Sequence, residues 1–235
     1  CPSEYDGAKW VGSPQPSMDN NICDWHAFNA EDISLLDIGD FKTKNPSMFC
    51  MPKATEERSV LVLRDPFNMF ASRYRLFKRV NSIRRMDGHS ELTPSDPTSA
   101  GVEISWYGNC AVNRWKQHAR EFLNITNILQ NKVCINYNRW FESRRYRKSI
   151  ALDLGIRFSD AKLNFVPNYG LGSSFDVRER NGEAQKMNVL SRWKGYRQDN
   201  LFKEIFSDEE LISLSLKIFP DITEVVIKAF GIHNG

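Results

Sequence analysis

The chain has 235 residues, of which 41% are hydrophobic and 26% are charged, so it can bury a core and is not disordered by composition. The formal net charge of +3 is too small to indicate a nucleic-acid binder. No secretory signal pattern is apparent, and no apolar run reaches the roughly 18 residues of a membrane span. We therefore expect a cytoplasmic α/β protein without a membrane span.

The cysteines and histidines give no metal pattern. The five cysteines are widely and irregularly spaced, which fits neither a disulfide framework nor a zinc site. The four histidines form no HxxxH or HExxH pattern. We expect a reduced protein without a structural metal.

The chain opens with Cys1, and residues 1–29 are rich in glycine, proline, serine and asparagine. This composition predicts an irregular segment, followed by a single α/β domain over residues 30–235. The missing initiator methionine leads us to expect a fragment or a processed chain.

Two strands are predicted in the first third of the domain, at residues 33–38 and at Ser59–Leu63. The second, SVLVL, is continuously apolar and β-branched, which is typical of a strand covered on both faces of a parallel sheet. Asp65 and Pro66 then predict a helix N-cap and first helical position. Apolar residues at helical spacing continue from there: Phe67, Phe70, Ala71, Tyr74 and Phe77.

The rest of the chain continues the alternation of helices and strands. Polar residues 86–105 predict a loop that could act as a lid, and Lys132–Asn136 (KVCIN) predicts a second buried strand. Helices are expected over residues 106–128, 141–154, 199–206 and 208–219, the second of them ending at Gly155. Strands separated by helices favour a layered α/β sheet with right-handed crossovers.

Arg64 is the first candidate binding residue because it follows the last apolar residue of the strand SVLVL. Ligands of open parallel sheets bind beyond the carboxyl ends of the strands. A guanidinium there, beside the positive end of the next helix, favours a phosphate. The alternative is a local salt bridge between Arg64 and Asp65.

The segment LRDPFNMFAS matches the pattern R-[DN]-P-x-[DN]-x-x-x-S, with Arg64 and Ser72 eight residues apart. This pattern resembles the element with which sulfotransferases hold the 3′-phosphate of 3′-phosphoadenosine 5′-phosphosulfate (PAPS). The resemblance implies that Arg64 makes a charge-assisted contact and that the Ser72 hydroxyl donates to the same phosphate. Without the resemblance, Ser72 would be interpreted as a solvent-facing helix serine.

Two later segments are similar to further parts of that family. VCINYNRW resembles a strand whose terminal tyrosine, here Tyr137, lies near the adenine, although the family often has Glu-Asp where this chain has Asn138 and Arg139. VLSRWKGYRQD resembles a loop that closes over the nucleotide phosphate, with Arg192 and Trp193 as the matching residues. Lys194 and Arg197 follow as additional cations. The alternatives are a core tyrosine and a basic surface loop.

The resemblance covers roughly residues 60–219 and implies a three-layer parallel sheet with helices on both faces, like the P-loop nucleotide-binding proteins. It also implies a PAPS-dependent sulfotransferase that passes a sulfuryl group to a hydroxyl or amine without a metal. Nothing in residues 1–45 matches the family's segment for the 5′-phosphosulfate, so we expect that segment to lie upstream and to be missing. Such a fragment could be inactive by itself.

The catalytic base is not identified by a motif. Asp37 is the candidate because it lies at the end of the strand predicted over residues 33–38, and Asp40 and His26 are alternatives. The acceptor and the oligomeric state are not encoded in a recognisable pattern.

Two other functions remain open. A small-molecule kinase would need Mg²⁺ and an upstream phosphate-binding lysine. A non-enzymatic module could use two basic clusters to bind a polyanion or a protein partner. The clusters are Arg73, Arg75, Lys78, Arg79, Arg84 and Arg85, and Arg139, Arg144, Arg145, Arg147 and Lys148. The run GLGSSF at residues 170–175 could line a pocket, but such a run is more often a turn.

Overall fold

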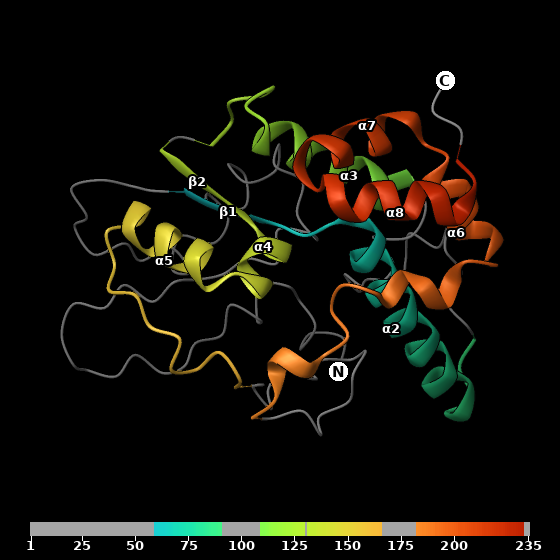
Figure 1. Cartoon of the computed structure of the whole chain (residues 1–235). Helices are drawn as coiled ribbons and strands as arrows, with labels where there is room; N and C mark the ends of the chain where they lie inside the picture. Colours follow the sequence, from blue (N-terminus) through green and yellow to red (C-terminus); the bar gives the residue numbers. More distant parts are fainter. Residues whose placement is uncertain (1–58, 91–108, 130, 166–181, 233–235) are drawn as a thin grey trace.

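The computed structural model describes residues 59–90, 109–129, 131–165 and 182–232 (Figure 1). The predicted strand at residues 33–38, with Asp37, Asp40 and His26 around it, lies outside the described residues, as do GLGSSF and most of the predicted lid. Within the described part the chain is a mixed α/β protein with a two-stranded parallel sheet.

Both predicted strands of the described region are confirmed. Strand β1 (Ser59–Leu63) pairs in parallel with β2 (Lys132–Asn136), in a register that sets Ser59 beside Lys132 and Leu63 beside Asn136. The two strands therefore end at the same edge of the sheet. Whatever follows Leu63 and Asn136 in the sequence is brought to one place.

Helix α2 (Pro66–Met86) begins as its sequence predicts. The Asp65 carboxylate accepts a hydrogen bond of 2.8 Å from the backbone N–H of Asn68, and Pro66 occupies the first turn. Phe67, Phe70 and Ala71 are buried on one face of the helix. This face anchors the first half of α2 in the core.

The predicted helix over residues 141–154 corresponds to α5 (Arg144–Asp153), and a separate short helix that was not predicted, α4 (Tyr137–Glu142), precedes it. Ser143 separates them with extended backbone angles, and its hydroxyl accepts a bond of 3.2 Å from the N–H of Tyr146. A capping serine explains the break, since it satisfies a backbone donor that a continuous helix would satisfy through its own carbonyl groups. Gly155, with φ of 69°, is confirmed as the glycine that ends α5.

Arg147 holds this helix pair together and is not part of a solvated basic face. Its Nε and Nη2 atoms donate to the two Asp160 oxygens at 2.8 and 3.0 Å, and Nη1 donates to the Trp140 carbonyl at 2.8 Å. The hydrogen bonds from Arg147 hold the pKa of Asp160 below its usual range. One member of the second basic cluster is therefore structural.

Two 3₁₀ turns, η6 (Ala184–Lys186) and η7 (Arg192–Tyr196), come next in the described part of the chain. Three helices follow them: α6 (Asn200–Phe206), α7 (Glu209–Ile218) and α8 (Pro220–Phe230). Asp199 and Asp208 cap the first two, whose positions were predicted. Helix α8 was not predicted. Its buried Val226 and Thr223 pack it into the core beside α7.

The core lies where these helices meet α2 and α3 (Asn109–Phe122). The rings of Phe67, Phe206 and Phe230 form a chain of edge-to-face contacts, with centroid separations of 5.0 and 5.1 Å. Figure 1 shows α3, α7 and α8 gathered together, with α5 apart from them beside the strands. None of the helices that the structure describes has the length and apolarity needed to cross a bilayer.

Glu121 is a fully buried carboxylate that closes the end of α3. It accepts hydrogen bonds from Thr126 Oγ1 at 2.6 Å and from the backbone N–H groups of Ile128 and Leu129 at 3.0 and 3.1 Å. Lys132 Nζ, at the start of β2, is also bonded to it. Glu121 thus ties helix α3 to the loop that leads into β2.

We expect the Glu121 carboxylate to make the free energy of unfolding depend on pH in the acidic range. Burial acts to raise the pKa of Glu121, but its four hydrogen bonds outweigh burial and lower the pKa to about 2. Because the folded state binds the proton less tightly than the unfolded state does, the stabilisation is complete above about pH 4.5 and is lost as the pH falls towards about 2. The free energy of unfolding should drop by about 3 kcal/mol over that window from this group.

Urea titrations at a series of pH values, on the wild type and Glu121→Gln, would check this expectation. The difference in unfolding free energy between the two proteins should shrink as the pH falls below about 4.5. A difference that stays constant between about pH 5 and about pH 2 would contradict the assignment.

Candidate anion-binding site

Two of the predicted site residues, Arg64 and Tyr137, lie at the edge of the sheet where both strands end. Arg64 follows β1 and Tyr137 follows β2, and the guanidinium carbon of Arg64 lies over the Tyr137 ring at 5.0 Å from its centroid. The Arg64 carbonyl accepts a bond of 2.9 Å from Trp115 Nε1, which fixes this strand end to α3. Arg64 and Tyr137 are thus brought together by the parallel register.

Two further predicted site residues, Ser72 of α2 and Arg192, are also in contact. Arg192 belongs to the 3₁₀ turn η7 (Arg192–Tyr196), and its Nη1 atom donates to Ser72 Oγ at 3.1 Å. Its Nε atom donates to the Asn188 carbonyl at 3.0 Å, and the residue is only 6% exposed. Two residues 120 positions apart in the chain are therefore in direct contact.

A buried network of three side chains joins the two pairs. Asn68 Nδ2 donates to both carboxylate oxygens of Asp65, at 3.0 and 3.1 Å, and Asn138 Nδ2 donates to Asp65 Oδ2 at 2.9 Å. Asn68 Oδ1 accepts from the backbone N–H of Arg192 at 2.7 Å. The network thus links Asn138, which follows Tyr137, to Asp65, which follows Arg64. From Asp65 it continues through Asn68 to η7.

Asp65 is therefore not simply the partner of Arg64 in a local salt bridge. Its hydrogen bonds go to Asn68 and Asn138, while the Arg64 guanidinium lies over Tyr137. Burial raises the pKa of Asp65, and the bonds from Asn68 and Asn138 and the charge of Arg64 oppose this rise. The Arg64 guanidinium and the Asp65 carboxyl group therefore lie at the same edge of the sheet, and Asn68 and Asn138 hold the carboxyl group in place.

The network also explains why an amide suits position 138. Asn138 donates to the Asp65 carboxylate. An acidic side chain there would set two carboxylates against each other in a buried position. The amide is the side chain that fits this neighbour.

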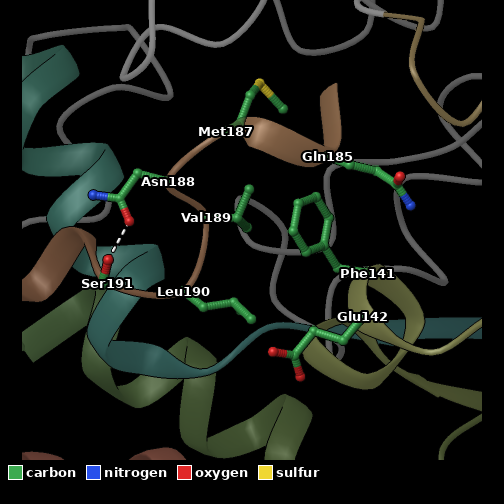
Figure 2. Close-up of a pocket in the computed structure, with 8 residues that line it drawn as sticks. All are labelled: Phe141, Glu142, Gln185, Met187, Asn188, Val189, Leu190 and Ser191. Atoms are coloured by element: carbon green, nitrogen blue, oxygen red, sulfur yellow. Dashed lines mark hydrogen bonds between the residues drawn. The ribbon is translucent and has the colours of Figure 1, made fainter. Parts of the chain in front are cut away.

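A cavity of about 470 Å³ lies between α4 and the segment that leads into η7 (Figure 2). Its lining combines apolar side chains with polar ones, and Glu142 is the one charged member: Phe141, Glu142, Gln185, Met187, Asn188, Val189, Leu190 and Ser191. Arg64, Ser72, Tyr137 and Arg192 do not line the cavity themselves. Two lining residues are their neighbours, because Ser191 precedes Arg192 and the Phe141 ring stacks with Tyr137 at 6.3 Å between centroids. The size of the cavity suits a small organic ligand.

Trp193 lies in the core and not at the surface of the site. It is 2% exposed and packs against Phe230, with ring centroids 6.1 Å apart. Its ring therefore anchors η7 to the C-terminal helices, while the neighbouring Lys194 and Arg197 are exposed. The residue holds Arg192 in place through the backbone.

Comparisons with known proteins add no assignment. A scan against models of protein families gives no match, and searches of curated proteins and of solved structures give no significant match. Among the described residues, no group of three or more metal-ligating side chains lies close enough to hold an ion.

Proposed function

We propose that this protein is a PAPS-dependent sulfotransferase, and that the site at the end of β1 holds the 3′-phosphate of its nucleotide. The observation that carries the proposal is the hydrogen bond between Arg192 and Ser72. Two separate resemblances related Ser72 and Arg192 to the nucleotide phosphate, although 120 positions separate them. Because the two side chains are in contact, one anion could meet both.

The chemistry of this pair suits a phosphate. A hydroxyl that accepts a hydrogen bond from a guanidinium keeps its own proton as a donor, so Ser72 can donate to an anion that Arg192 also faces. Arg64 supplies a second guanidinium at the strand end, close to the positive end of α2. Two guanidinium groups and one hydroxyl would then donate to the phosphate, while the nearby Asp65 carboxylate is occupied by hydrogen bonds from Asn68 and Asn138.

The neighbouring cavity suits the nucleoside. Tyr137 lies at the strand end, and Phe141 beside it lines a cavity large enough for a base and a ribose. The amide and carboxylate groups of Gln185 and Glu142 could accept hydrogen bonds from the amino group of an adenine. We therefore propose that the 3′-phosphate meets Ser72 and Arg192 while the base enters this cavity.

The proposed reaction is an in-line transfer. An acceptor oxygen or nitrogen forms a bond to the sulfur of PAPS as the bond from sulfur to the bridging phosphate oxygen breaks, which releases adenosine 3′,5′-bisphosphate. The acceptor's proton passes to a base, for which Asp37 stays the sequence candidate. The proposed fold places the β1–β2 pair within a three-layer sheet of the P-loop type.

Calorimetric titration with adenosine 3′,5′-bisphosphate tests the proposal, with adenosine 5′-monophosphate as the matched ligand that lacks the 3′-phosphate. The bisphosphate should bind about tenfold or more tightly, since the 3′-phosphate would add charge-assisted hydrogen bonds. Equal affinities, or no binding of the bisphosphate, would overturn the assignment. Preferential binding of ATP with Mg²⁺ would favour the kinase, and salt-sensitive binding of heparin alone would favour the polyanion module.

A further inference from the structure

We infer that Asn68 is a positioning residue, which sets the Arg192 guanidinium against Ser72 by capping the turn η7 from a different helix. The inference rests on the proposed function, because it concerns the same phosphate site. Asn68 is completely buried and lies one turn before Ser72 on α2. It touches both the start of α2 and the start of η7.

The orientation of the Asn68 amide is fixed by its neighbours. Its Nδ2 group faces the two Asp65 oxygens at 3.0 and 3.1 Å, and a carboxylate can only accept. The amide oxygen must then point the other way, towards the backbone N–H groups of Arg192 at 2.7 Å and Trp193 at 3.5 Å. The same carboxylate therefore caps α2 and determines how Asn68 meets η7.

The turn η7 needs this partner. The first N–H groups of any helix lack acceptors within the helix, and Ser191, which precedes η7, makes no side-chain capping bond. The Asn68 oxygen takes the place of that cap. Because the bonded N–H belongs to Arg192 itself, the carboxamide determines where the Arg192 side chain starts.

The guanidinium is held at its far end by Ser72 and near its middle by the Asn188 carbonyl. With its backbone fixed by Asn68, the side chain is held at three points. A preorganised cation loses less conformational entropy when an anion binds than a mobile one does. Asn68 would thus raise nucleotide affinity without touching the nucleotide.

A double-mutant cycle between Asn68→Leu and Arg192→Ala tests this role, with adenosine 3′,5′-bisphosphate as the probe. Asn68→Leu should weaken binding about tenfold in the wild-type background and less than about twofold in Arg192→Ala, where no guanidinium remains to be positioned. Thr223→Val, which removes another buried polar group, in α8, whose hydrogen bond goes to the Phe219 carbonyl, should leave the affinity unchanged. Equal losses from Asn68→Leu in both backgrounds would overturn the inference.

Amide hydrogen exchange on the protein without nucleotide provides a second readout, which does not depend on the proposed function. In Asn68→Leu, the Arg192 amide should exchange about tenfold faster, while amides in the middle of α7 keep their wild-type rates. An unchanged Arg192 rate would overturn the capping role, whether or not the nucleotide binds. Failure of the wild type to bind nucleotide, with the exchange effect present, would instead refute the proposed function.

Should Asn68→Leu fail to fold, the exchanged pair Asp65→Asn with Asn68→Asp keeps the network polar. In this double variant the amide at position 65 would donate to the carboxylate at position 68. The other oxygen of that carboxylate would still accept from the Arg192 N–H. Asn138 would have to rotate its amide, because its NH₂ group would otherwise face the NH₂ group at position 65. The double variant should bind the bisphosphate better than Asn68→Asp alone, in which two buried carboxylates face each other. The absence of such a rescue would contradict the inference.

Discussion

Replacing Glu121 by alanine should lower the free energy of unfolding by about 3–5 kcal/mol, the largest loss of stability that we expect from a single substitution at a polar site. The substitution leaves the Lys132 ammonium, whose side chain is 7% exposed, without its carboxylate. It also removes the acceptor for the N–H groups of Ile128 and Leu129. Urea denaturation at neutral pH measures the effect.

The surface pair between Arg120 and Glu210 provides a matched control. It joins the same helix, α3, to α7, but the Glu210 side chain is 42% exposed. Lys116, which lies 3.4 Å from Glu210, keeps its ion pair with Asp208 when Glu210 is replaced. Glu210→Ala should therefore cost less than about 1 kcal/mol. The double variant Glu121→Leu with Lys132→Met should be more stable than Glu121→Ala, because it removes both buried charges. Similar costs for Glu121→Ala and Glu210→Ala would contradict the role of the buried pair.

The second large effect concerns binding. Arg64→Ala should weaken the affinity for adenosine 3′,5′-bisphosphate by more than about tenfold, because a charge-assisted contact is worth roughly 1.5–3 kcal/mol. Arg64→Lys should recover only part of the loss. An ammonium keeps the charge but lacks the planar fork, which lies over Tyr137 here and which in general can donate to two phosphate oxygens together.

Arg79→Ala is the control for net charge, since it removes one exposed cation from the same region of the sequence. It should change the affinity less than about twofold. An affinity that Arg64→Ala leaves unchanged would remove Arg64 from the site. Equal losses from both alanine variants would mean that only the overall charge attracts the nucleotide.

The local elements of the fold are the part that the sequence predicts best. The strands β1 and β2, the N-cap Asp65 and the terminating Gly155 all depend on neighbouring residues, and all were found. The break at Ser143 was not predicted, although a serine is a common N-cap residue and its hydroxyl accepts from the N–H of Tyr146.

Helix α8 was missed although its sequence contains usable signals. Pro220 stands at its first turn, and Gly231, with φ of 66°, ends it in the left-handed conformation that favours glycine. A pattern of proline inside the start and glycine just past the end would have identified the helix.

For the candidate site, too, the sequence predicts individual residues but not the contacts between distant ones. A pattern within one segment singled out Arg64 and Ser72, and similar motifs singled out Tyr137 and Arg192. The network of Asp65, Asn68 and Asn138 joins residues 73 and 124 positions apart, and a single sequence carries no signal for such contacts. The burial of Trp193 likewise depends on Phe230, near the end of the last helix.

A crystal structure of the protein with adenosine 3′,5′-bisphosphate tests the central claim most directly. We expect the 3′-phosphate within hydrogen-bonding distance of Ser72 Oγ and of the guanidinium groups of Arg64 and Arg192, with the base in the cavity beside Phe141. A nucleotide bound elsewhere, or a 3′-phosphate that contacts none of these three residues, would contradict it.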